Sequence, residues 1–73
     1  MKESAEMNEY AYKWARYLEI SWPHAFGDIL SIRNAIGWDK TREYCERRIA
    51  GDKISLNQFC EENDLPRFYG EQI

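Results

Sequence analysis

The stretch SWPHAFGDILSIRNAIG, residues 21–37, carries the most hydrophobic helical pattern of this chain of 73 residues. Pro23 disfavours helical geometry at the residue before it and has no N–H group, so it ends one helix and opens the next. Aliphatic residues then recur at intervals of four, three and four, which places them on one face of a helix. They are Ala25, Ile29, Ile32 and Ile36, with Phe26 and Leu30 beside them. We therefore predict a central helix over residues 24–36, ended by a left-handed residue at Gly37.

A second helical pattern precedes this stretch, over residues 4–20. Its apolar face consists of Met7, Ala11, Trp14 and Leu18, with Tyr10 and Tyr17 at the sides. Charged residues occupy the opposite side, where Glu9 and Lys13 can pair across one helical turn. Ser4 has a side chain suited to an N-cap. The pattern predicts one amphipathic helix that begins near Ser4.

The segment after the central helix, residues 40–50, predicts a third helix with a narrow apolar face. Its apolar residues are mainly Tyr44, Cys45 and Ile49, and the rest of the segment is charged or polar. Asp39 can cap the N-terminus of this helix, and Gly51 ends it. We expect this helix to bury one stripe and to expose a wide solvated face.

The strongest local signal is ISLNQF, residues 54–59. Ser55 and Gln58 form the Ser-x-x-Gln pattern of a capping box, in which each residue accepts a hydrogen bond from the backbone of the other. A hydrophobic staple flanks the box, formed by Ile54 and Phe59. The pattern predicts a fourth, short helix over residues 56–62.

The chain after this helix carries stop signals, because Asn63 and Leu65 suit a C-terminal cap and Pro66 cannot continue a helix. A last helical turn over residues 66–72 is expected after Asp64, although Gly70 weakens it. No stretch shows the alternation of a strand. We therefore predict one all-α domain of residues 1–73. It is a small bundle of four short helices, over residues 4–20, 24–36, 40–50 and 56–62.

The charge is mixed and slightly acidic, with 13 Asp and Glu against ten Lys and Arg. Neither residues 1–37 nor residues 38–73 have the basic surplus that non-specific phosphate binding needs. The first ten residues lack the apolar stretch of a secretory signal, and no segment has the apolar length of a membrane span. We expect a cytoplasmic protein in which Cys45 and Cys60 are reduced thiols.

The residues offer little for catalysis or for a metal. The single histidine, His24, lies at a helix start, where the helix dipole disfavours its charged form. Cys45 and Cys60 could join His24 at a metal, but zinc ligands come in closely spaced pairs and this chain has none. The two cysteines fit small buried core thiols better. We expect no enzyme activity and no cofactor.

Aromatic residues are abundant, with three Trp, five Tyr and three Phe. So many rings are hard to bury in a small domain, so some should reach the surface, where exposed aromatics mark partner interfaces. The candidate interface residues lie off the main stripes or at helix junctions. They are Tyr12, Trp22, Trp38, Phe68 and Tyr69. The alternative is that these rings take part in ordinary core or junction packing, with tyrosine hydroxyls in water.

Residues 55–67, SLNQFCEENDLPR, resemble the first helix and turn of the helix-turn-helix unit in excisionases and transposase-associated proteins. The resemblance implies that the next helix, here residues 66–73, enters the major groove of DNA. The implied base contacts are Arg67 and Gln72, and the implied phosphate contacts are Arg42, Arg47, Arg48 and Lys53. Acidic residues interleave with these and would repel the DNA backbone: Glu43, Glu46, Glu61, Glu62 and Asp64.

Three functions remain open at this point. The first is a small regulator, inhibitor or adaptor, of the phage or mobile-element kind, that docks on a larger protein. The second is a helix-turn-helix protein that binds duplex DNA, as a dimer in the common arrangement of this class. The third is a helical unit that self-associates through the apolar face of its first helix. We favour protein binding, because the aromatic excess and the acidic balance both suit it.

Overall fold

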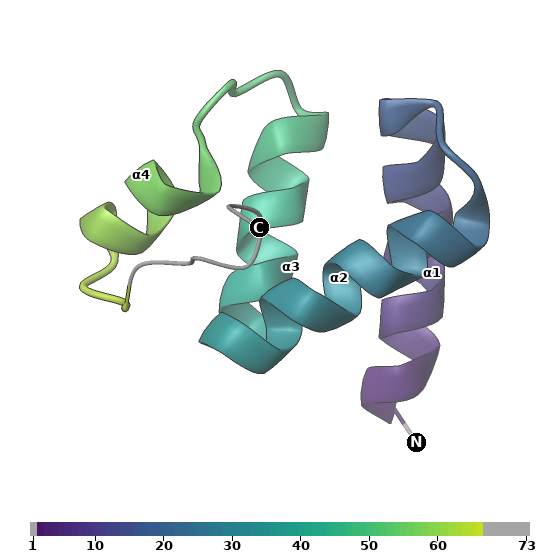
Figure 1. The fold of residues 1–73 in the computed structure, drawn as a ribbon, viewed down its shortest axis with the longest axis horizontal. Helices are drawn as coiled ribbons and strands as arrows, with labels where there is room; N and C mark the ends of the chain where they lie inside the picture. The colour runs from purple at the N-terminus through teal and green to yellow at the C-terminus, as the bar shows by residue number, and fades with distance from the viewer. Residues whose placement is uncertain (1, 67–73) are drawn as a thin grey trace.

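The fold is known from a computed structural model, which describes residues 2–66. The described residues form four α-helices and no strand, which confirms the predicted all-α fold (Figure 1). The helices are α1 (Lys2–Leu18), α2 (Trp22–Ile36), α3 (Trp38–Ile49) and α4 (Leu56–Glu62). None of the helices in residues 2–66 has both the length and the apolar character needed to cross a membrane.

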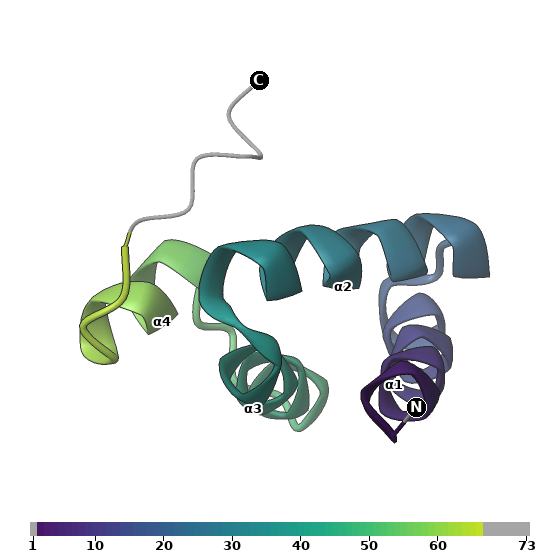
Figure 2. The ribbon, with the colours of Figure 1, turned by 90° about the horizontal axis from the view of Figure 1, so that it is seen from below.

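Three helices form the body of the molecule. Helices α1 and α3 lie beside each other and run in the same direction, and α2 crosses over both of them (Figures 1 and 2). Helix α4 lies beyond α3, on the side away from α1 (Figure 1). The most hydrophobic helix therefore takes the central place, as its sequence predicts.

The core is shared by all four helices, and α2 contributes to it the four residues that the spacing predicts. Helix α1 buries Met7, Ala11 and Trp14, and Leu18 packs against the core edge. The buried hydrophobic residues are Met7, Tyr10, Ala11, Trp14, Ala15, Ala25, Ile29, Ile32, Ile36, Trp38, Tyr44, Cys45, Ile54, Leu56, Phe59 and Cys60. The apolar face of α1, which the self-association hypothesis would use, is covered by other parts of the chain.

Three predicted helix starts lie two residues too far along the chain, and one of them is that of α2, which begins at Trp22 rather than at residue 24 and has Pro23 in its first turn. Helix α1 begins at Lys2, so Ser4 lies inside the first turn and is not its N-cap. Helix α3 begins at Trp38 rather than after Asp39, because Gly37 takes a φ of 87° and turns the chain directly from α2 into α3. Gly37 lies between the last residue of α2 and the first residue of α3. Its carbonyl accepts a hydrogen bond from the Thr41 hydroxyl at 2.7 Å. A side chain at Gly37 would be strained by this backbone geometry.

The start of α4 is as predicted. The Ser55 hydroxyl accepts from the Gln58 backbone N–H at 3.1 Å, and the Gln58 side chain accepts from the Ser55 backbone N–H at 3.2 Å. The staple residues Ile54 and Phe59 are both buried. The helix occupies the predicted residues 56–62. The predicted last turn over residues 66–72 lies outside the described part of the chain, apart from Pro66.

Candidate functional site

Three aromatic rings line up at the junction of α1 and α2, and we call Tyr12, Trp22 and Phe26 the aromatic ladder. The Tyr12 and Trp22 ring centroids are 5.6 Å apart with planes tilted by 37°. Trp22 stacks on Phe26 with centroids 5.1 Å apart and planes at 29°. Tyr12 is 61% exposed, while Trp22 and Phe26 are partly buried. The ladder is thus a pre-packed apolar surface with one ring open to solvent.

The local chain geometry explains the ladder. Trp22 is the first residue of α2 and Phe26 lies one turn later, so the two side chains stand above each other on the helix. Tyr12 follows the buried Ala11 on α1 and therefore lies at the edge of the core face. The short link between α1 and α2 folds Trp22 back over this edge.

The structure separates the predicted interface residues. Tyr12 is exposed as predicted, and Trp22 lies beside it. Trp38 does not lie on the surface as the interface prediction requires, because it is 9% exposed and belongs to the core. Its indole N–H donates to the Glu6 carboxylate at 2.9 Å, and its ring meets the Tyr10 ring edge-on at 5.6 Å. The turn at Gly37 places Trp38 inside the first turn of α3, facing α1. Two other candidates, Phe68 and Tyr69, lie outside the described residues.

Phe26 is not among the interface residues predicted from the sequence, although its spacing of four from Trp22 indicates that the two share a helix face. Tyr17 is a second missed residue, and it is 37% exposed. The sequence pattern does not predict the exposure of Tyr17, because this residue lies at the side of the apolar stripe of α1, where burial depends on the neighbouring helix.

The predicted DNA-contacting arginines of α3 face their own chain. The Arg42 guanidinium lies 3.5 Å from the Glu6 carboxylate and 3.8 Å from that of Asp39. Lys53 is exposed. Two further predicted contacts, Arg67 and Gln72, lie outside the described residues.

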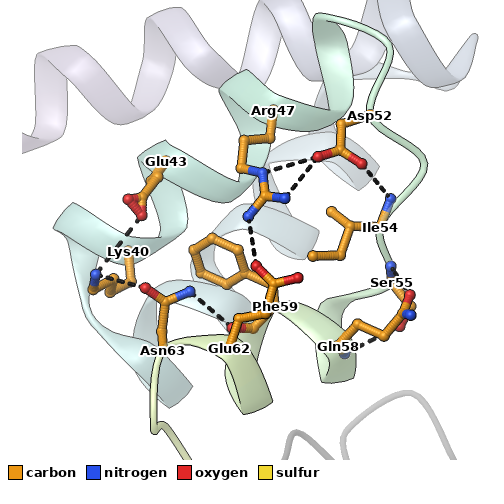
Figure 3. A network of polar contacts seen from close by, with 10 residues as sticks. All are labelled: Lys40, Glu43, Arg47, Asp52, Ile54, Ser55, Gln58, Phe59, Glu62 and Asn63. Atoms are coloured by element: carbon orange, nitrogen blue, oxygen red, sulfur yellow. Dashed lines mark hydrogen bonds and ion pairs between the residues drawn. The ribbon is translucent and has the colours of Figure 1, made fainter.

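Arg47 joins α3 to the loop and helix that follow it (Figure 3). Its guanidinium pairs with Asp52 at 2.7 Å and with Glu62 at 3.2 Å, and lies 5.8 Å from the centre of the Phe59 ring. Hydrogen bonds to Asp52 and then to Glu62 raise the pKa of Arg47 above its usual range. This residue therefore fastens α4 to α3.

A second contact joins the C-terminal end of α4 to α3 (Figure 3). The Lys40 ammonium group donates to the Asn63 side-chain oxygen at 2.9 Å. The Asn63 amide in turn donates to the Phe59 carbonyl at 2.8 Å. The contact between Lys40 and Asn63 thus links the C-terminal end of α4 to α3.

Arg48 occupies a different environment, which we call the Arg48 cage. The guanidinium carbon lies 5.8, 5.9 and 5.7 Å from the ring centres of Trp14, Tyr17 and Tyr44. One guanidinium nitrogen donates to the Tyr44 hydroxyl at 2.6 Å. Burial disfavours the charged form, but hydrogen bonding to Tyr17 and interaction with Tyr44 outweigh it and raise the pKa of Arg48. The guanidinium stays charged among three rings.

The groups that could carry chemistry are dispersed. Cys45 and Cys60 are buried free thiols, as the sequence predicts. His24 Nδ1 lies 2.7 Å from the Ser21 hydroxyl, and this pair is exposed at the start of α2. No third group orients the imidazole among the described residues. Within residues 2–66 no three His, Cys, Asp or Glu side chains gather as metal ligands would.

Comparison of the chain with protein-family models, with curated proteins and with solved structures gives no match. The second helix that the helix-turn-helix resemblance requires would begin at Pro66 and lies almost wholly outside the described residues.

Proposed function

We propose that this chain is a non-enzymatic binding protein that docks on a larger protein partner through the aromatic ladder. The observation that carries the proposal is Tyr12, whose ring is 61% exposed while it contacts the indole of Trp22. Tyrosine and tryptophan are the residue types that most often dominate binding energy in protein interfaces. A regulator, inhibitor or adaptor would use such a surface.

The packing of the ladder supports this role. Trp22 and Phe26 are held by stacking and by the start of α2, so a partner would not have to order them. Tyr12 has few rotatable bonds and carries both an apolar face and a hydroxyl group. A partner that covers the Tyr12 ring would gain apolar contact at a small entropic cost.

Affinity capture with the immobilised full chain tests the proposal, using an extract of the organism that carries it. Tyr12→Ala removes the exposed ring, and Tyr12→Phe keeps the ring but removes the hydroxyl. We expect a specific partner whose affinity falls at least about tenfold with Tyr12→Ala and little with Tyr12→Phe, since loss of a central aromatic costs about 2 kcal/mol or more. Circular dichroism confirms that each variant is folded. A partner that binds both variants with the same affinity as the original chain would rule out the ladder as the docking surface.

Binding to duplex DNA is the second candidate, and the capped helix followed by a turn at residues 55–66 is the observation that favours it. Against it, Arg42 and Arg47 each pair with two carboxylates, which DNA phosphates would have to displace. A titration of duplex DNA at several salt concentrations decides between the two functions. DNA binding predicts an affinity that falls steeply as salt rises, whereas a protein-binding module shows no DNA affinity even at low salt.

A further inference from the structure

We propose that the Arg48 cage is a recognition site for a single carboxylate, namely an Asp or Glu side chain in a protein segment with apolar neighbours. This site is separate from the aromatic ladder. Tyr12 and Tyr17 are five positions apart on α1, so their side chains point about 140° apart around the helix axis. The proposal therefore stands independently of the ladder.

Arg48 has no carboxylate partner among the described residues. Arg33, Arg42 and Arg47 each pair with at least one carboxylate of the chain. Within residues 2–66, Arg48 contacts hydroxyl groups and ring faces instead. A desolvated guanidinium gains most from an ionised acceptor.

The cage holds more hydrogen-bond donors than acceptors. Three buried side-chain nitrogens of the described residues have no hydrogen-bond acceptor, and two of them, Trp14 Nε1 and Arg48 Nε, belong to this cage. Trp14 is only 4% exposed. A guanidinium carries five N–H donors and no acceptor. Donors therefore outnumber the hydroxyl oxygens that Tyr17 and Tyr44 supply, and an anionic acceptor would redress this imbalance.

One edge of the cage lies at the protein surface. Tyr17 is 37% exposed and Arg48 is partly exposed, so the edge of the cage reaches solvent. Both residues lie near the C-terminal ends of α1 and α3, which end on the same side of the molecule (Figure 1). A partner side chain can therefore approach the cage from the solvent side of Tyr17 and Arg48.

The chemistry of the cage favours one carboxylate over a polyanion. The planar fork of a guanidinium matches the two oxygens of a carboxylate. The rings around it offer apolar contact to the neighbours of that carboxylate. The chain as a whole carries a formal net charge of −3, which repels a nucleic-acid backbone more strongly than a single acidic side chain.

NMR on the ¹⁵N-labelled full chain tests the proposal with two capped peptides as probes. Acetyl-Leu-Glu-Leu-amide carries one carboxylate, and acetyl-Leu-Gln-Leu-amide has nearly the same shape without the charge. We expect saturable shifts of the Arg48 Nε–H and Trp14 indole N–H signals with the Glu peptide. The Gln peptide should bind about tenfold more weakly, as expected for loss of a charged hydrogen bond. The Trp22 indole signal, in the aromatic ladder, should not move.

Two variants with the same loss of charge complete the test. Arg48→Met should abolish the response of the Trp14 indole, and Arg16→Met, on the exposed face of α1, should preserve it. Equal responses to the two peptides, or equal losses in the two variants, would overturn the proposal. So would a stronger response of the Arg48 signal to a short DNA duplex than to the Glu peptide. The comparison of the two peptides needs no variant and remains decisive if Arg48→Met does not fold.

Discussion

Cys45 shows how strongly position controls a side chain in this small protein. Its thiol is 0% exposed, and burial raises its pKa from 9.0 to about 12. Tyr10 behaves in the same way, because burial and then its hydrogen bond to Glu46 raise its pKa from 10.0 to about 12. In both cases the folded chain favours the neutral, protonated form.

The stability of the fold should therefore fall at alkaline pH. A group whose pKa is higher in the folded chain contributes its full stability below the unfolded pKa and loses it as pH rises through the folded pKa. For Cys45 this window runs from about pH 9 to about pH 12. Its ionisation should cost about 2–4 kcal/mol over that window, at roughly 1.4 kcal/mol for each unit of pKa difference.

Urea unfolding at pH 7 to 11 measures this effect. The Cys45→Ala variant starts from a lower stability, because it loses packing atoms, but its stability should decline less steeply above pH 9. Tyr10 still titrates in the variant, so the difference between the two slopes reports Cys45. Parallel slopes in the two proteins would show that folding does not raise the pKa of Cys45.

Helix ends illustrate how one backbone motif accepts different residues. Helices α1, α3 and α4 all end with a residue of positive φ, followed by an N–H that reaches back to a carbonyl five residues earlier. The pairs are Ile20 to Ala15, Asp52 to Arg47 and Leu65 to Cys60, at 3.0, 3.0 and 2.8 Å. Glycine supplies the positive φ at Gly51, whereas Glu19 and Asp64 take φ values of 58° and 56°. This is the Schellman arrangement, in which glycine is the favoured residue.

Glu19→Gly should therefore stabilise the protein. A left-handed backbone costs a non-glycine residue about 1–2 kcal/mol, and the greater freedom of glycine in the unfolded chain offsets part of the gain. We expect a net gain of about 0.5–1 kcal/mol in the free energy of unfolding. Gly51→Ala is the matched control with the opposite sign. A Cβ there would meet no atom within 4 Å, so its cost would come from the φ of 111° alone. A Glu19→Gly variant that melts below the original chain would contradict this account.

The molecule as a whole is a three-helix body with a fourth helix attached at one side. Phe59 and Cys60 anchor α4 in the common core. Arg47 and its two acidic partners lie over this anchor at the surface (Figure 3). Because α4 has only seven residues, it depends on these tertiary contacts more than on its own helical hydrogen bonds.

Arg47→Met should loosen α4 without unfolding the body. The variant keeps an apolar stem over Phe59 but removes the pairs with Asp52 and Glu62, so α4 should open more often. Hydrogen exchange should then become faster at the amides of α4 and stay unchanged in the centre of α2. Arg33→Met, which removes the pair with Glu3, is the matched control and should leave α4 unaffected. Equal acceleration across all helices would show that Arg47 supports the whole fold.

Local patterns in the chain were enough to predict four helices and most of the core. The spacing of Ile29, Ile32 and Ile36 requires a buried helical face whatever lies opposite it. The capping box of Ser55 needs only backbone groups three residues away, so it forms as predicted. Such features depend on neighbours in the sequence, and their physical cause is visible there.

The surface depends on contacts between residues far apart in the chain. Trp38 is buried because α1 lies against it, and Arg42 and Arg47 are paired because carboxylates from other elements reach them. The Arg48 cage combines rings from α1 and α3, and the aromatic ladder combines rings from α1 and α2. The spacing of residues in the sequence does not predict these contacts between helices, because they form only when α2 crosses over α1 and α3.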